Sequence, residues 1–251
     1  MTQMHFHRNW IALFEAIANE IEGAYCWRDA GVFYGITGMD TSVFNVAILE
    51  DRQPLTAGRL ERIGVQMMNI PLPYSIQFCH HLRQPQSDLA ILERGHYLNL
   101  FIDPLRWHGG ALPVIPTPEI RVRSLEMGAS TEDYTRVVIT AFDLMNEAKS
   151  FLDLMLRLRN GYHVVAYLEG EPVGTGTVML CGGVAGVYNV AAMPGVRRRG
   201  VGRAIMTALH AEALRCGYPG TALASSTLGI GLYAALGYQD DGYQLAYEIR
   251  S

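Results

Sequence analysis

Residues 188–206 place a basic, glycine-containing turn between an apolar run and a helical pattern. The turn itself, residues 197–202, has the sequence RRRGVG. A strand that leads through such a turn into a helix is a building unit of α/β folds. The first turn of a helix leaves backbone N–H groups without partners and carries partial positive charge, and glycine lets a bound group approach the backbone closely. The sequence therefore predicts an anion site here, and a phosphate suits it best. The plainer interpretation is a solvated basic turn ahead of a helix.

The pattern of elements in the second half favours an α/β fold with a mixed sheet. Period-two runs and apolar repeats at helical spacing predict their order. In sequence they are a strand at 119–125, helices at 131–145 and 149–159, strands at 162–168, 172–180 and 184–192, a helix at 200–216, a strand at 221–224, a helix at 229–236 and a strand at 244–249.

The first half predicts a smaller α/β domain. We expect helices near 10–21, 57–68 and 87–93, and strands near 32–36, 43–49, 74–78 and 96–102. Residues 103–118 contain four prolines and a Gly-Gly pair, which disfavour a helix or a central strand. This division predicts an N-terminal domain at 1–103, a Pro/Gly-rich linker at 104–118 and a second domain at 119–251.

Composition excludes several classes of protein. Apolar residues make up 49% of the chain and charged residues 18%, which is ample material for a core, and the net charge of −4 disfavours a nucleic-acid-binding surface. No apolar run approaches the roughly 18 residues of a membrane span. The four cysteines are scattered, so spacing predicts no metal site and no disulfide framework. We expect a soluble, cytoplasmic protein with no metal, no nucleic-acid partner and no membrane partner.

A second motif lies at residues 224–238, ASSTLGIGLYAALGY. The small-residue strand end followed by a helix with L-Y-x-x-L-G-Y resembles the later signature of the GNAT family of N-acetyltransferases, and the turn at 197–202 resembles that family's R-x-x-G-x-G pyrophosphate loop. The resemblance covers about residues 119–251. It implies a GNAT fold with a mixed, mostly antiparallel central sheet, and the first half could be a degenerate GNAT-like copy that lacks the pyrophosphate loop.

The resemblance also implies a bacterial-like enzyme that uses acetyl-CoA as co-substrate and transfers the acetyl group directly to a primary amine. By similarity Tyr233 is the candidate general acid for the departing CoA thiolate. A phenol titrates near 10 and a thiol near 8.5, so hydrogen-bond donation to the sulfur is a safer role than full proton transfer. The cofactor-binding residues that it implies are Val190, Ala191, Ala192, Arg197, Arg198, Arg199, Gly200, Val201, Gly202, Arg203 and Ser226.

Several alternatives stay open in the sequence. Asn189 either faces the acceptor or is a hydrogen-bonded structural residue, and Glu126, Glu147 and Tyr188 are all conceivable general bases. The acceptor is a small molecule or a peptide, the first half could cap it, and a homodimer is possible. A CoA-binding sensor or structural protein without turnover is the alternative function. The G-x-G-x-x-A spelling at 229–234 also matches a dinucleotide fingerprint, but too little chain follows for the rest of such a domain.

Overall fold

The computed structural model describes residues 4–51, 53–80, 86–95, 97–113, 116–117, 119–144 and 148–249. The chain forms two compact units. Unit 1 comprises Met1–Leu105 and Asp241–Ser251, and unit 2 comprises Arg106–Asp240. The unit boundaries fall inside two long strands, so the chain passes between the units within β5 and again within β11.

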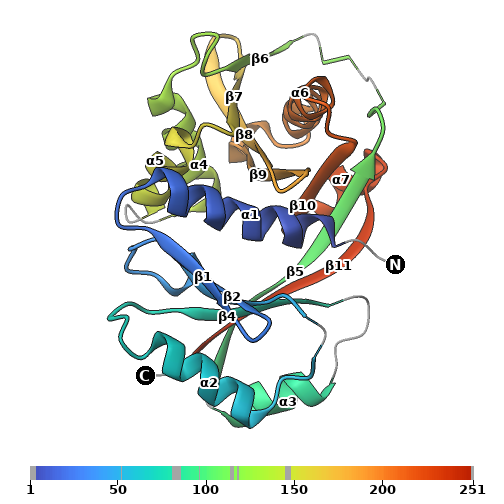
Figure 1. The fold of residues 1–251 in the computed structure, drawn as a ribbon. Helices are drawn as coiled ribbons and strands as arrows, with labels where there is room; N and C mark the ends of the chain where they lie inside the picture. Colours follow the sequence, from blue (N-terminus) through green and yellow to red (C-terminus); the bar gives the residue numbers. More distant parts are fainter. Residues whose placement is uncertain are drawn as a thin grey trace. The chain divides into compact units, whose positions relative to one another are not determined.

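Unit 1 is an α/β layer with the strand order β1-β2-β3-β4-β11-β5 (Figure 1). Strands β1, β2 and β3 are antiparallel neighbours, β3 and β4 are parallel, and β4 and β11 are antiparallel. Its elements are α1 (His5–Glu20), β1 (Tyr25–Asp29), β2 (Val32–Ile36), the 3-10 helix η1 (Ser42–Phe44), β3 (Asn45–Leu49), α2 (Ala57–Met67), β4 (Ser75–His80), α3 (Gln86–Arg94), β5 (Tyr97–Gly109) and β11 (Gln239–Ile249).

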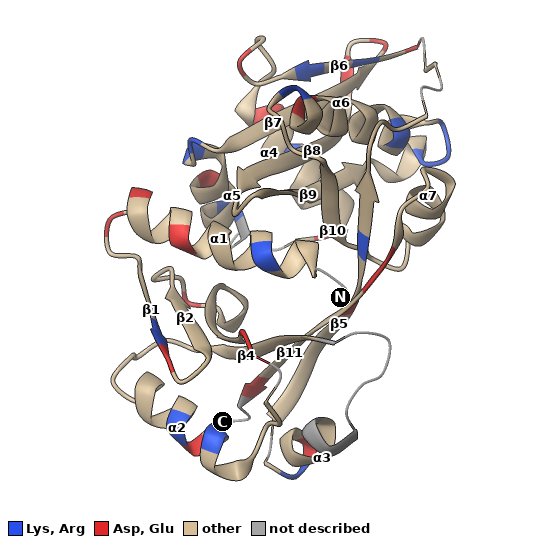
Figure 2. Ribbon diagram, turned by 45° about the vertical axis from the view of Figure 1, so that its right-hand side comes forward, with Lys and Arg blue, Asp and Glu red and all other residues tan. Residues whose placement is uncertain are grey.

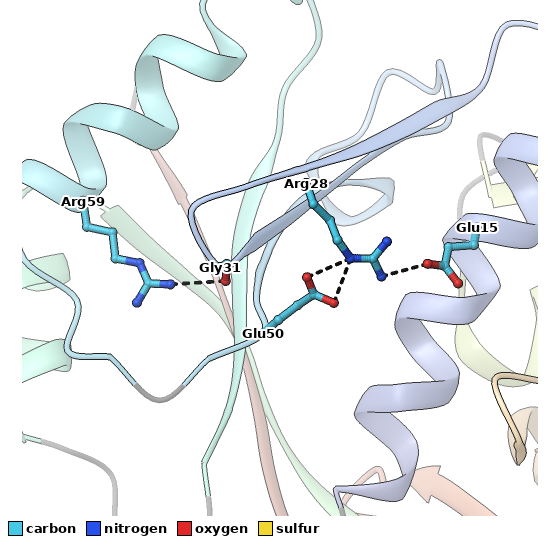
Figure 3. A network of polar contacts seen from close by, with 5 residues as sticks. All are labelled: Glu15, Arg28, Gly31, Glu50 and Arg59. Carbon is cyan, nitrogen blue, oxygen red and sulfur yellow. Dashed lines mark hydrogen bonds and ion pairs between the residues drawn. The ribbon is translucent and has the colours of Figure 1, made fainter.

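Local sequence explains the elements of unit 1. Helix α1 buries Trp10, Leu13, Phe14 and Ile17, which recur at the spacing of one helical face. An ion-pair network ties the connection that follows β3 to its surroundings (Figure 3): the Arg28 guanidinium donates to Glu15 at 2.8 Å and to Glu50 at 2.9 Å. The pairs are largely exposed, so they contribute little stability.

Unit 2 holds the strand order β5-β10-β9-β8-β7-β6 (Figure 1). Strands β6 to β9 are antiparallel neighbours, and β9 and β10 are parallel because α6 connects them as a crossover. Its elements are β6 (Ile120–Ser124), α4 (Thr131–Phe142), α5 (Ala148–Arg157), β7 (Gly161–Leu168), β8 (Glu171–Cys181), β9 (Val184–Ala192), the 3-10 helix η2 (Pro194–Val196), α6 (Val201–Arg215), β10 (Gly220–Ala224) and α7 (Ile230–Ala235).

The core of unit 2 fixes where its functional surface lies. Helix α6 packs its buried Val201, Ile205 and Leu209 on one face of the sheet. Glycines in β8 permit this approach, because a Cβ at Gly174 or Gly176 would collide with Val201 or Ile205. Helices α4 and α5 cover a separate cluster around Tyr134 and Val165. The turn that opens α6 is therefore held rigidly at one end of the sheet, and Figure 2 shows basic residues concentrated in it.

The predicted fold class is confirmed: both units are α/β, and the strand pairs are mostly antiparallel. The predicted order of elements in the second half is also found. Other features differ from expectation. Strand β1 is not among the predicted elements, and α1 begins at His5 rather than near residue 10.

The predicted linker at 104–118 also differs from the structure. Strand β5 continues through Pro104 to Gly109, because a proline's fixed φ is compatible with an extended chain and only its hydrogen-bond donor is lost. The compact units differ from the predicted limits of 1–103 and 119–251, since residues 241–249 pair with β4 and belong to unit 1.

Candidate functional site

A β-bulge interrupts strand β9 near its end. Thr175 faces Ala191 across the β8–β9 pair, but Thr177 faces Tyr188, so Asn189 and Val190 together occupy the place opposite Gly176. Asn189 has φ 53°, in the left-handed region that asparagine tolerates better than most residues. The polar residue inside an apolar strand thus marks a change in strand geometry. This favours the structural interpretation of Asn189 over a role facing the acceptor.

Beyond the bulge, β9 separates from its other neighbour. The parallel β9–β10 pairs are Ala185 with Thr221, Gly186 with Ala222 and Val187 with Leu223, and the register ends there within the described residues. Residues Val190, Ala191 and Ala192 lie past this point and line a cleft. Their strand edge is therefore available to an extended ligand, as strand addition requires.

The turn between β9 and α6 is built as an anion cradle. Arg198 has φ 67° and Gly200 has φ 88°, so the chain turns sharply before α6 begins at Val201. Gly200 is the N-cap residue, and among the described residues no side chain caps the helix. The N–H groups of the first turn of α6 therefore have no side-chain cap in the part of the chain that the structure describes, and the helix dipole adds positive potential at the same place.

The arginines of this turn differ in what their side chains contact. Arg197 donates to the carbonyl of Ala141 at 3.3 Å and lies 3.4 Å from the carbonyl of Ala192, so it ties the end of α4 to the end of β9. Arg199 lies 3.8 Å from Glu119 in an exposed ion pair. Arg203 lines the cleft, and its buried Nε has no hydrogen-bond partner within the described residues.

Tyr233 lies on the short helix α7 and also lines the cleft. Its ring is 6% exposed and packs edge-on against Tyr238, with the ring centroids 5.7 Å apart. The absence of a side chain at Gly229 makes room for it, because a Cβ there would lie 2.6 Å from Cε2 of Tyr233. Burial raises the pKa of the Tyr233 phenol above its ordinary value. The phenol stays protonated at neutral pH, which suits a hydrogen-bond donor.

These elements enclose a cleft of about 750 Å³ that lies entirely within unit 2. Every predicted site residue lines it except Arg199, which points to Glu119 instead. The prediction missed Ala141 and Phe142 at the end of α4, for which no sequence motif gave a signal. It also missed the exposed rim residue Leu228, which is part of the second motif. The remaining lining residues are Val196, Thr227, Gly229, Gly231, Leu232 and Ala235.

The three candidate bases are placed differently. Glu126 is exposed in the turn after β6. Burial raises the pKa of Tyr188 well above its usual value, so this phenol is a poor base at neutral pH. Glu147 lies outside the described residues. Among those residues no group of three or more His, Cys, Asp or Glu side chains is arranged to hold a metal ion. None of the described helices is long and apolar enough to cross a membrane.

Comparison with known families identifies this unit. Residues 159–240, which include the bulge, the cradle and Tyr233, match a family model described as an acetyltransferase (GNAT) domain. This segment of the chain is therefore similar to GNAT acetyltransferase domains. A curated relative, the uncharacterized protein YyaT of Bacillus subtilis (strain 168), is 28% identical over 95 residues. That match covers 38% of this chain and 64% of the relative, so this chain spans less than two thirds of the relative's length.

Solved structures extend the likeness of fold to the whole chain. A GCN5-related N-acetyltransferase from Kribbella flavida matches with a TM-score of 0.72 and 18% identity, covering 98% of this chain and 96% of its own. A tandem GNAT protein from the clavulanic acid biosynthesis pathway matches with a TM-score of 0.56 and 12% identity, covering 97% and 94%. Both matches include unit 1, which is evidence about its fold alone.

Proposed function

We propose that the protein is an acetyl-CoA-dependent N-acetyltransferase that transfers an acetyl group directly to a primary amine of a small molecule or peptide. The observation that carries the proposal is the cleft of unit 2. It joins an uncapped helix N-terminus beside arginines, an open strand edge and a buried phenol. These groups would contact three parts of acetyl-CoA: the helix N-terminus its pyrophosphate, the strand edge its extended pantetheine arm, and the phenol its thioester sulfur.

The cofactor has a specific place in this proposal. The pyrophosphate binds the N–H groups at the start of α6, where Gly200 and Gly202 leave the backbone accessible. Arg203 offers a buried Nε that no described residue satisfies. The pantetheine arm lies along Val190, Ala191 and Ala192, and its amides bond to the open edge of β9. Ser226 lines the opposite wall, after β10.

The proposed reaction is a direct displacement. The neutral amine attacks the thioester carbonyl, the C–N bond forms, the C–S bond breaks, and the amine loses its proton to a base or water. The departing CoA carries the electron pair on sulfur, and the Tyr233 hydroxyl donates a hydrogen bond to it. Because burial raises the pKa of this phenol, complete proton transfer to a thiolate would be unfavourable, so charge stabilisation is its role.

A second candidate function is a CoA-binding sensor without turnover. It is favoured by the described placement of the base candidates, since neither Glu126 nor Tyr188 is positioned as a ready base in the cleft. It uses the same cradle and predicts the same CoA binding. The two functions differ only in whether an amine releases the CoA thiol.

The test combines binding with turnover. Isothermal titration measures CoA and acetyl-CoA affinity, and a thiol-release assay with acetyl-CoA then scans small amines, amino acids, polyamines and peptides. We expect saturable binding, and thiol release that depends on one class of amine and yields a product heavier by one acetyl group. Binding without release from any amine would favour the sensor, and no binding of either ligand would refute both functions.

A further inference from the structure

The bulge at Asn189 has a conformation that its surroundings must impose. A non-glycine residue in the left-handed region is strained and persists only where neighbouring contacts determine it. Asn189 meets this description with φ 53°. Its side-chain amide approaches the Tyr134 hydroxyl, and this hydrogen bond opposes the rise in the pKa of Tyr134 that burial causes. Tyr134 is therefore one of the groups that can hold the bulge in place.

Two threonines of β8 flank the bulge. Thr175 donates its hydroxyl to the carbonyl of Asn189 at 3.1 Å. Thr177 faces Tyr188, the residue before the bulge, and lies 2.5 Å from the Tyr134 hydroxyl and 2.8 Å from Nδ1 of His163. The network of Thr177, Tyr134 and His163 thus joins α4, β7 and β8 beside the residue that precedes the bulge.

The network is buried and neutral. Thr175 and Thr177 are fully buried, and Tyr134 is 1% exposed. Burial lowers the pKa of His163 to about 4 and raises that of Tyr134 to about 12, the latter opposed by hydrogen bonds to Thr177 and by the nearby Asn189 side chain. A neutral His163 can accept the Thr177 proton, and Thr177 can in turn accept from Tyr134. Both bonds then share one hydroxyl, and the low local dielectric strengthens each of them. Nε2 of His163 is buried and has no hydrogen-bond partner among the described residues.

We propose that Thr177, with Tyr134 and His163, is a positioning network that fixes the Asn189 bulge and so aims the N–H groups of the following β9 residues at the acyl carbonyl of bound acetyl-CoA. This inference rests on the proposed function, because it assigns the network to the acyl end of the same cleft. The network touches neither cofactor nor acceptor. It acts through the backbone of Asn189, which continues directly into Val190 and the cleft wall.

Binding measurements distinguish a positioning role of the network from a contribution to stability alone. Acetyl-CoA and CoA share the pyrophosphate and pantetheine, but only acetyl-CoA has the carbonyl that the aimed N–H group receives. Thr177→Val removes the hydroxyl at nearly constant shape, Thr177→Ser restores it, and Tyr134→Phe removes the other partner. Titration with both ligands is run on each variant alongside thermal denaturation.

We expect Thr177→Val and Tyr134→Phe to weaken acetyl-CoA binding by about fivefold, the order of one neutral hydrogen bond, while CoA affinity changes less than about twofold. Thr177→Ser should recover the wild-type ratio of the two affinities. An unchanged ratio in whichever of the valine and phenylalanine variants folds would overturn the network's positioning role while leaving CoA binding intact. Failure of the wild-type protein to bind either ligand would instead refute the proposed function.

Discussion

The two units share a run of elements but differ in one connection within it. Each has three antiparallel strands, a crossover helix to a parallel strand, and then another helix. The run is β1-β2-β3, α2, β4 and α3 in unit 1, and β7-β8-β9, α6, β10 and α7 in unit 2. Helices α2 and α6 even begin alike, with Ala57-Gly58-Arg59 and Val201-Gly202-Arg203. The two helices differ in the connection that leads into them from the preceding strand.

In unit 1 the protein's own groups occupy the helix start. Thr56 caps α2 by accepting from the N–H of Arg59, and the Arg59 guanidinium lies 2.8 Å from Asp51. The same guanidinium donates to the carbonyl of Gly31 (Figure 3). Glu50 and Asp51 place two carboxylates in this connection, and β2–β3 has no bulge in its register.

In unit 2 the helix start has no such cap. Gly200 provides no side-chain cap within the described residues, and no carboxylate pair like Glu50 and Asp51 lies in the RRRGVG turn. Nε of Arg203, like that of Arg59, is buried without a hydrogen-bond partner among the described residues, so the difference between the units lies in the cap and in the charge of the connection. A crossover helix can therefore supply an anion site only where the chain leaves its first turn unsatisfied, and the fold alone does not create one.

The largest effect on CoA affinity should come from placing a carboxylate at the uncapped start of α6 in unit 2. Gly202→Glu places a side chain and a negative charge on the first turn of α6, and we expect CoA affinity to fall by at least about 100-fold, as for losing charge-assisted hydrogen bonds. An acidic residue at a helix start favours the helix, and the nearest obstacle is the flexible end of Leu232. Isothermal titration measures the change.

Gly58→Glu is the matched control, at the same position of α2. No atom of the described protein lies within 4 Å of a Cβ placed there, so the substitution should fold and leave CoA affinity unchanged. Equal effects of the two variants would contradict the distinction between the units, and an unchanged affinity in Gly202→Glu would remove the cradle assignment.

The second prediction concerns the helix that follows the parallel strand. Tyr233 precedes Gly237 by four residues in unit 2, and Ile91 precedes Gly95 by four residues in unit 1, so only unit 2 offers a phenol there. Tyr233→Phe should lower kcat by about 10- to 100-fold, as for loss of a donor to developing charge. CoA affinity should change by less than about threefold, because the cradle remains.

The control for this prediction is Tyr238→Phe. Tyr238 is buried and bonds to Thr221 rather than lining the cleft, so its loss should lower the melting temperature and spare kcat. A full rate for Tyr233→Phe at saturating acetyl-CoA would show that the phenol has no part in turnover.

The smallest predicted effect is a loss of folding stability at acid pH, to which both units contribute. Burial lowers the pKa of His7 in unit 1 and of His163 in unit 2 to about 4. In the unfolded chain these two histidines bind protons as the pH falls through about 6.5, but in the folded chain they stay neutral there. The free energy of unfolding is therefore highest above the unfolded pKa and declines as the pH falls toward the folded pKa. Each histidine should cost on the order of 1 kcal/mol by about pH 5.5.

Urea denaturation between pH 7.5 and 5 measures this slope. His7→Gln and His163→Gln should each reduce it, and an acid slope that persists in the double variant would assign the sensitivity to other groups. Since Tyr233 stays protonated throughout this range, its role adds no change of its own.

Most of the fold could be predicted from local patterns in the sequence. Period-two and helical repeats located the elements of unit 2, and the glycines with their arginines predicted the sharp turn that precedes α6. Strand β1 gives no such signal, because none of its residues from Tyr25 to Asp29 is buried and their exposure does not alternate with period two. The network of Tyr134, His163 and Thr177 was beyond sequence reasoning, because the three residues lie on separate elements that only tertiary packing brings together. The same is true of Phe142 in the cleft wall.

The place of strand β11 in the sheet has a consequence for folding during synthesis. It follows every other strand in the sequence, yet it lies between β4 and β5. On the ribosome, unit 1 therefore lacks β11 until the whole of unit 2 has been made, and the facing edges of β4 and β5 stay unpaired until then. A fragment without residues 239–249 would keep this gap in its sheet, so we expect it to aggregate more readily than the full chain.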